Sequence, residues 1–273
     1  MRVSPIATRL VALLLAAALI SGCAGRSATD EQDEFEGVAE QQLYDEARDA
    51  LEGGRYTTAI TRLEAIDTRY PFGRHAEQAQ LELIYAYYQT QDWEAARAAA
   101  SRFIRLHPTH PQADYALYMR GLASWQAGRF SLERLRLIDI SKRDLGASRD
   151  AYNDFRELVS RYPASEYAPD AEQRIVYLRN VLARHELHVA DFYLRKGAYL
   201  AAVERGRWVI ENYPEAEATR DALAVMVEGY LGLDMRDRAR EVLQVLIEND
   251  PGNERLRGRT FQPQHVRAQS LSA

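Results

Sequence analysis

Along most of the chain, an alanine and an apolar residue recur at fixed distances before a proline. Each alanine lies twelve residues before its proline, and the apolar residue follows the alanine by seven. Seven residues make two helical turns, so both side chains share one helix face, and the proline ends the helix because it lacks an N–H group. The pattern predicts five helices, whose alanines and apolar partners are Ala59 and Ile66, Ala96 and Phe103, Ala151 and Leu158, Ala202 and Val209, and Ala239 and Leu246.

A partner helix is predicted before each of these five, and it ends at a turn. The turns are marked by Gly54, Gln91, Gly128, Gly197 and Asp234, and a small or apolar residue precedes each mark by seven positions: Ala47, Ile84, Gly121, Ala190 and Val227. This pattern resembles the tetratricopeptide repeat (TPR), in which small residues let the two helices of a hairpin approach closely. We therefore expect an all-α fold, a TPR solenoid of five helical hairpins over residues 38–251, stacked around a concave groove.

Two spacings are longer than the repeat requires. In the third hairpin, 18 extra residues separate the two helices, which predicts an insert at 131–148. In the fourth, 14 extra residues precede the turn and contain neither glycine nor proline. Fourteen residues are about four helical turns, so the apolar face keeps its phase. The first helix of the fourth hairpin is therefore expected to be one elongated helix, from about Tyr167 to Lys196.

The N-terminus has the pattern of an export signal. Arg2 and Arg9 precede an apolar run over 10–20, which is too short for the ~20 residues of a membrane-spanning helix. The run ends in Leu-Ile-Ser-Gly-Cys at 19–23, which resembles the lipobox of bacterial lipoproteins and contains the only cysteine of the chain. The alternative is an ordinary signal peptide with a chance cysteine.

The lipobox resemblance implies a signal peptide at 1–22 and covalent lipid on Cys23, namely an S-diacylglycerol group and an N-acyl chain. Ala24 follows the cysteine, which in many Gram-negative bacteria directs a lipoprotein to the outer membrane. Residues 23–37 are polar and acidic, so we expect an acylated flexible tether, and a lipid-anchored protein at the outer membrane that faces the periplasm.

Composition narrows the function further. The 35 Lys and Arg residues against 40 Asp and Glu give a net charge of −5, which argues against nucleic acid as a partner. One cysteine excludes an intrachain disulfide and multi-cysteine zinc sites. Common nucleotide-binding, zinc-protease and hydrolase motifs are missing. These absences do not exclude an enzyme without a known motif, but the repeats occupy nearly the whole mature chain and leave no room for a catalytic domain. We therefore expect a protein that is not an enzyme, with no catalytic residue, no metal site and no cofactor beyond the lipid.

Two further regions carry expectations from the residues alone. Residues 252–273 are basic and poor in apolar residues, so we expect a mobile tail; a basic contact to a partner or to lipid phosphates is the alternative. Tyrosines cluster on the first helices of hairpins two and three. Most of these should fill the repeat core, but Tyr85, Tyr88, Tyr115 and Tyr118 are candidates for holding a peptide in the groove.

Several blocks of the chain look like the BamD family, the TPR lipoproteins of the outer-membrane β-barrel assembly machinery. They are Tyr-Pro-Phe-Gly at 70–73, Leu-Ile-Tyr-Ala-Tyr-Tyr at 83–88, Arg-Phe-Ile-Arg-Leu-His-Pro at 102–108, Tyr-Met-Arg-Gly-Leu at 118–122 and Ala-Thr-Arg-Asp-Ala-Leu at 218–223. The basic tail after Pro251 is a departure from the family.

The resemblance implies a periplasmic scaffold without bond chemistry. Its C-terminal hairpins would dock on periplasmic domains of the barrel-forming subunit and on companion small lipoproteins. Its N-terminal hairpins would receive unfolded outer-membrane proteins for insertion. Arg205 matches an arginine that contacts the barrel subunit in the family, and Arg220 and Asp221 lie in a matching block. The alternative function is a TPR lipoprotein scaffold for cell-wall or envelope-division proteins.

Overall fold

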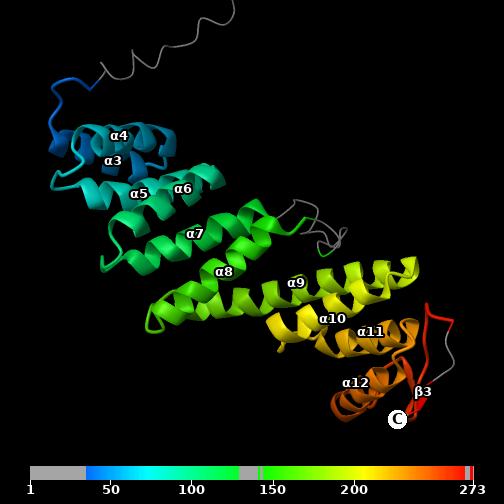
Figure 1. The fold of residues 1–273 in the computed structure, drawn as a ribbon. Coiled ribbons are helices and arrows are strands. Elements are labelled where there is room, and N and C mark those ends of the chain that lie inside the picture. The colour runs from blue at the N-terminus through cyan, green and yellow to red at the C-terminus, as the bar shows by residue number, and fades with distance from the viewer. Residues whose placement is uncertain (1–34, 129–140, 142–143, 268–270, 273) are drawn as a thin grey trace, which may run out of the picture.

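The structure, a computed structural model, describes residues 35–128, 141, 144–267 and 271–272. In this part of the chain ten helices, α3 to α12, are followed by three short strands. The helices pair as five consecutive hairpins, which confirms the predicted TPR solenoid (Figure 1). The predicted signal peptide at 1–22, Cys23 and all but the last residues of the predicted tether lie outside the described residues.

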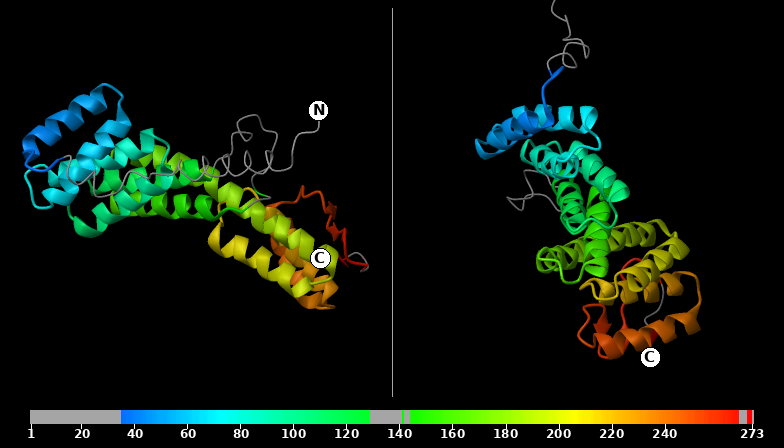
Figure 2. Two further views of the ribbon diagram at one scale, coloured as in Figure 1. Left: turned by 90° about the horizontal axis from the view of Figure 1, so that it is seen from above. Right: turned by 90° about the vertical axis from the view of Figure 1, so that its left-hand side faces the viewer.

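The hairpins follow one another along an elongated array, with the first at one end and the fifth at the other (Figure 2). In chain order the pairs are α3 (Glu40–Glu52) with α4 (Tyr56–Arg69), α5 (Ala76–Gln89) with α6 (Trp93–Leu106), α7 (Ala113–Ala127) with α8 (Gly146–Arg161), α9 (Ala168–Lys196) with α10 (Tyr199–Asn212), and α11 (Thr219–Gly232) with α12 (Arg236–Asn249). None of these described helices is both long and apolar enough to cross a bilayer.

The second helix of every hairpin ends in the same way. The residue before each proline leaves the helical conformation, because the proline ring crowds the backbone that precedes it. Its N–H still donates to the carbonyl of the apolar residue four positions earlier, at 2.8 Å in all five hairpins. The repeated proline therefore sets each helix end at the predicted place.

Close approach of the two helices depends on small residues in the seam. All five predicted alanines are fully buried, and their apolar partners are at most 1% exposed. In the third hairpin Gly121 faces the ring of Phe155, and a Cβ at this glycine would lie 2.7 Å from the ring. Only a residue without a side chain permits this packing of α7 on α8.

Four of the five predicted turn marks adopt left-handed backbone conformations. Their φ angles are 67° at Gly54, 63° at Gln91, 73° at Gly197 and 57° at Asp234. Such a residue reverses the chain directly after a helix. Gly128, which lies just before the predicted insert, differs: its φ is −80°, in the right-handed region.

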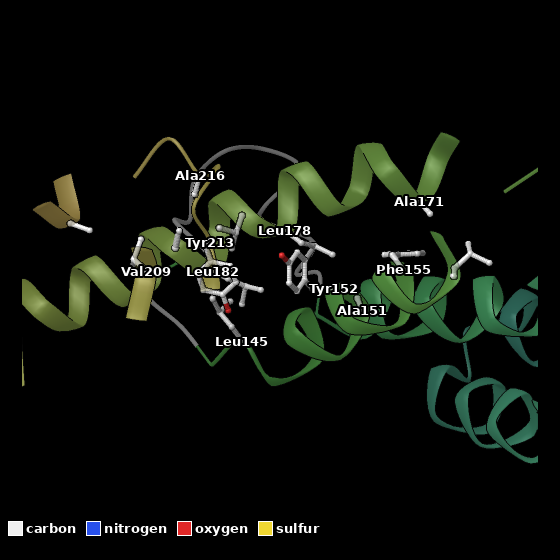
Figure 3. Packing of buried hydrophobic residues seen from close by; sticks show 14 of the residues in the cluster. Leu145, Ala151, Tyr152, Phe155, Ala171, Leu178, Leu182, Val209, Tyr213 and Ala216 are labelled. Carbon is white, nitrogen blue, oxygen red and sulfur yellow. The ribbon is translucent and has the colours of Figure 1, made fainter. Parts of the chain in front are cut away.

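The insert is attached to the core of hairpins three and four, although most of it lies outside the described residues. Leu145 is 5% exposed and packs in a cluster with Tyr152, Phe155, Leu178 and Leu182 (Figure 3). The backbone carbonyl of Ser141 lies 2.6 Å from His185 Nδ1. The elongated helix predicted from Tyr167 to Lys196 is confirmed as α9.

The prediction of a mobile tail after Pro251 is wrong for the residues that the structure describes. Strands β1 (Leu256–Arg257), β2 (Thr260–Phe261) and β3 (Leu271–Ser272) form an antiparallel sheet in the order β1-β2-β3, in which Leu256 pairs with Phe261 and Phe261 with Leu271. Phe261 is fully buried and Leu271 is 3% exposed, both against α11 and α12. These two apolar residues order the segment despite its basic composition.

Candidate binding surfaces

An aromatic row runs along the first helices of hairpins two to four. We define it as Tyr85 of α5, Tyr115, Tyr118 and Trp125 of α7, and Tyr167 and Tyr177 at the start of hairpin four. Tyr118 stacks on Tyr167 with ring centroids 4.7 Å apart, and Tyr115 lies 5.9 Å from the same ring. Trp125 contacts Tyr177 at 5.2 Å. The row therefore links α7 to α9 by ring contacts.

Polar side chains fix the middle of the aromatic row. The Tyr118 hydroxyl donates to Asp170 Oδ2 at 2.7 Å, and Arg174 Nε donates to the same oxygen at 2.5 Å. Burial, followed by the hydrogen bond to Asp170, raises the pKa of Tyr118 to about 12. Burial alone would raise the pKa of Asp170, but the hydrogen bonds from Arg174 and Tyr118 outweigh it and lower that pKa. Tyr118 is thus a neutral donor at physiological pH.

The four candidate groove tyrosines differ in how much they offer to a ligand. Tyr85 is 37% exposed, and its ring meets the edge of Tyr56 at 6.0 Å. Tyr88, Tyr115 and Tyr118 are half-buried and pack against the core of hairpins two and three. Burial raises the pKa of Tyr115, as expected for a phenol in the seam. Most of the cluster is therefore repeat core, as the helical phase predicts, and Tyr85 offers the most open ring of the four.

Sequence analysis did not single out Tyr167 and Tyr177. Tyr177 is 42% exposed, so it and Tyr85 are the open rings of the aromatic row. Their spacing along the elongated helix was the available signal, because Tyr167, Arg174 and Tyr177 recur at intervals of seven and three. That spacing places them on one helix face, but it does not show which neighbouring helix they meet.

Arg205 pairs with a buried carboxylate. It lies on α10, and its Nη1 is 2.7 Å from Oε2 of Glu186 on α9. The Glu186 side chain is 5% exposed, whereas that of Arg205 is 44% exposed. The guanidinium group therefore neutralises an internal charge and also interacts with Tyr193, while the side chain stays partly exposed. Trp208, on the same helix, is 49% exposed.

Arg220 and Asp221 have different neighbours, although they are adjacent in the sequence. Arg220 lines a pocket of about 630 Å³ between the turn after α10 and helix α12, together with Pro214, Leu223 and Val245. Asp221 instead faces the C-terminal segment, where partial burial and then repulsion from Glu254 raise its pKa. The three predicted partner-binding residues therefore do not form one cluster.

A second pocket adjoins the first at the turn after α10. Its volume is about 720 Å³, and Val159, Val176 and Arg179 of α8 and α9 line it. Both pockets include Pro214 and Glu215, and Glu215 is ion-paired with Arg179. Hairpins three to five thus present two adjoining pockets that are lined by both apolar and charged side chains. Within the described residues, no three His, Cys, Asp or Glu side chains are placed to hold a metal ion.

Known proteins similar to this chain agree with one another. The outer membrane lipoprotein model named YfiO matches residues 37–246. "Outer membrane protein assembly factor BamD" of Vibrio cholerae is 43% identical over 235 residues, covering 85% of this chain and 95% of that protein. The protein of the same name from Neisseria gonorrhoeae is 40% identical and covers 88% of each chain.

Solved TPR structures resemble the chain only loosely. The P58(IPK) TPR domain covers 78% of this chain and 52% of its own, at 17% identity and a TM-score of 0.40. A tetratricopeptide repeat protein from Parabacteroides merdae covers 78% of this chain and 68% of its own, at 14% identity and a TM-score of 0.34. The family follows from the sequence relatives: this chain belongs to the YfiO family of outer membrane lipoproteins, whose curated members are named BamD.

Proposed function

We propose that this protein is a scaffold for outer-membrane protein assembly, held at the membrane by lipid on Cys23. The observation that carries the proposal is the 43% identity to an outer membrane protein assembly factor over nearly its whole length. The regular helical array supports a role in holding other chains rather than in bond chemistry. In this role it faces the periplasm, docks on the barrel-forming subunit and companion small lipoproteins, and receives unfolded outer-membrane proteins.

The partner contacts are assigned to the C-terminal hairpins. Arg205 is suited to such a contact because its guanidinium group is only half covered after it pairs with Glu186. A partner carboxylate would bind the exposed part of this side chain, near the exposed ring of Trp208 on the same helix. The pocket beside Arg220, next to α12, is a separate site where an apolar side chain of a partner would bind. Asp221 is assigned to the partner contact indirectly, through the C-terminal segment around Glu254 and Arg255 that it faces.

Substrate contacts are assigned to the aromatic row. Its open rings, Tyr85 and Tyr177, would bind apolar and aromatic side chains of an unfolded chain by shallow contacts. Tyr88, Tyr115 and Tyr118 support that surface from below and have smaller exposed areas. Shallow contacts of this kind suit a scaffold that must release its substrate again.

A pull-down tests the function as a whole. The tagged mature protein is extracted from its own envelope in mild detergent, and the bound proteins are identified by mass spectrometry. We expect a barrel protein with large periplasmic domains together with small lipoproteins. Recovery of cell-wall or division proteins without that barrel protein would refute the proposal and support the alternative scaffold function.

Two conservative variants test the partner contact. Arg205→Lys keeps the positive charge beside Glu186 but removes the planar fork, so it should lower recovery of the barrel protein several-fold while the fold stays intact. Arg207→Lys is the matched control, because Arg207 is equally exposed on the same helix and contacts Glu204 and the Tyr230 hydroxyl of α11 instead of a buried carboxylate. Equal recovery with both variants would remove Arg205 from the interface.

Tyr85→Ala tests the substrate surface. It should weaken binding of an unfolded outer-membrane protein, measured by fluorescence anisotropy after dilution from urea. Phe192→Ala, which removes another exposed ring at 47% exposure, serves as control. Equal losses in the two variants would mean that the chain binds unfolded proteins through any exposed ring, and the aromatic row would lose its assignment.

A further inference from the structure

The end of the array is covered by the chain itself. In the part of the chain that the structure describes, α12 is followed by three short strands instead of another hairpin, and α11 and α12 would expose an apolar surface without them. Residues 253–267 together with 271–272, which we call the clasp, cover that surface. Phe261 and Leu271 of the clasp pack against Val227 and Leu231 of α11 and Leu243 of α12. In Figure 1 the clasp is the red segment beside α12. A solenoid needs such an end, because an open terminal repeat exposes its core.

The clasp is fastened to α11 by one buried carboxylate. Glu228 is fully buried, in a run of otherwise apolar residues. Its Oε1 accepts hydrogen bonds from the backbone N–H groups of Gln264 at 2.8 Å, of His265, and of Val266 at 2.9 Å. Its Oε2 accepts from Arg255 Nη1 at 2.6 Å. All four donors belong to the clasp, and the array itself supplies only the acceptor.

A second contact joins the clasp to hairpin four. His265 Nε2 lies 2.7 Å from Oδ1 of Asp191 on α9, 74 residues earlier in the chain. Asp191 is also ion-paired with Arg195, one turn further along α9. The clasp therefore contacts α11, α12 and α9 together, so it spans the junction between hairpins four and five.

We propose that the clasp locks hairpin five onto hairpin four, with Glu228 as its fastening point. A buried charge is costly unless it is fully paired, so Glu228 would be destabilising in α11 if the clasp were absent. The cost is offset only when the clasp is seated. Because three of the four bonds come from backbone N–H groups, the fastening depends on the path of the chain and hardly on the side chains at 264–266.

Hydrogen exchange on the full-length chain in detergent tests the proposal. In the unaltered protein, the amides of Gln264, His265 and Val266 should exchange slowly, because they are bonded to a buried acceptor. Glu228→Gln removes the charge and one acceptor oxygen. It should speed exchange at these three amides roughly 10- to 100-fold, the factor that corresponds to loss of a hydrogen bond to a charged group.

The controls separate the fastening from general loss of structure. Gln264→Ala should leave the three amides protected, because only its backbone is bonded to Glu228. Phe261→Ala lies outside the helices and should release the clasp while circular dichroism keeps the helical signal. His265→Ala should leave Phe261 seated but raise exchange of α12 amides relative to α10.

The opposite results would overturn the proposal. Fast exchange at 264–266 in the unaltered protein would mean that the clasp is not fastened. Unchanged protection in Glu228→Gln would mean that Glu228 is not the fastening point, and unchanged exchange of α12 in His265→Ala would mean that the clasp does not lock hairpin five onto hairpin four. The proposal does not depend on which partners bind the array, so a failed pull-down would leave it intact.

Discussion

Replacing Gly121 with alanine tests the close approach of α7 and α8 directly. The new Cβ would lie 2.7 Å from Cε1 and 2.9 Å from Cδ1 of the Phe155 ring. That ring is fully buried, and Tyr118 at 6.2 Å between centroids and the Arg174 guanidinium group at 5.9 Å pack around it. The variant therefore has to displace this packed ring or one of the two helices.

Two opposing effects set the magnitude. Alanine is favoured over glycine inside a helix by about 1 kcal/mol. Overpacking a filled core costs about 1–3 kcal/mol, and the rigid ring places Gly121→Ala in the middle of that range. We therefore expect a net loss of about 1 kcal/mol in the free energy of unfolding. In a Phe155→Leu background the clash is relieved, so the same change should stabilise by about 1 kcal/mol, which corresponds to a coupling near 2 kcal/mol.

Urea unfolding followed by far-ultraviolet circular dichroism measures all four members of this cycle. Gly146→Ala is the matched control, since a Cβ at Gly146, the first residue of α8, meets only an ordinary contact with Asp144 at 3.5 Å. The control should be neutral or stabilising. The reasoning would be refuted if Gly121→Ala stabilised the protein as the control does, or if the coupling lay within about 0.5 kcal/mol of zero.

Three other changes have defined outcomes. Arg205→Glu should lower the unfolding midpoint, unlike Arg205→Lys, because it leaves Glu186 buried beside a second carboxylate; an unchanged midpoint in thermal melts would contradict the buried pair. In an absorbance titration of the tyrosines, Tyr118→Phe should remove one phenol that ionises near pH 12. Since the folded-state pKa of Tyr118 lies above its usual value of 10.0, its contribution to stability is present below pH 10 and is lost as the pH rises toward 12. Cys23→Ser should shift the protein from the membrane fraction to the soluble fraction; continued sedimentation with membranes would exclude lipid on Cys23 as its main anchor.

The fold could be predicted because every hairpin repeats the same physical instructions. In each hairpin an alanine allows the two helices to approach closely, an apolar residue packs between them and a proline ends the second helix. Once this spacing is recognised, it predicts all five pairs of helices. The insert in the third hairpin and the length of α9 followed from departures in spacing. Gly128, which precedes the predicted insert, keeps an ordinary right-handed conformation, unlike the other four turn marks.

The clasp escaped prediction because it does not share that repeat. The clasp is held by Phe261 and Leu271, which are ten residues apart in a basic segment. It is also held by hydrogen bonds to Glu228, which lies 27 residues before Arg255, the first donor in the clasp. The signal was in α11 rather than in the tail, since a lone carboxylate at Glu228 interrupts an apolar run. A buried charge in such a place requires partners from elsewhere.

The binding surfaces were only partly predictable for a related reason. Helical phase predicts that most of the tyrosine cluster fills the repeat core, and the candidate groove residues Tyr115 and Tyr118 are half-buried and pack there. Helical phase does not fix the offset between α7 and α9, which decides that Tyr118 meets Tyr167. The pairing of Arg205 with Glu186 depends on the same kind of offset, between α9 and α10.

The length of α9 has a mechanical consequence. Its 29 residues form one rod of about 43 Å at 1.5 Å per residue, roughly twice as long as its neighbours. Its first turns carry Asp170 and Arg174 against α7, and its last turns carry Asp191 against the clasp. A rod of that length is a lever: a tilt of about 5° at its base moves the far end by about 4 Å. A small displacement at the aromatic row would therefore arrive, amplified, at the C-terminal hairpins.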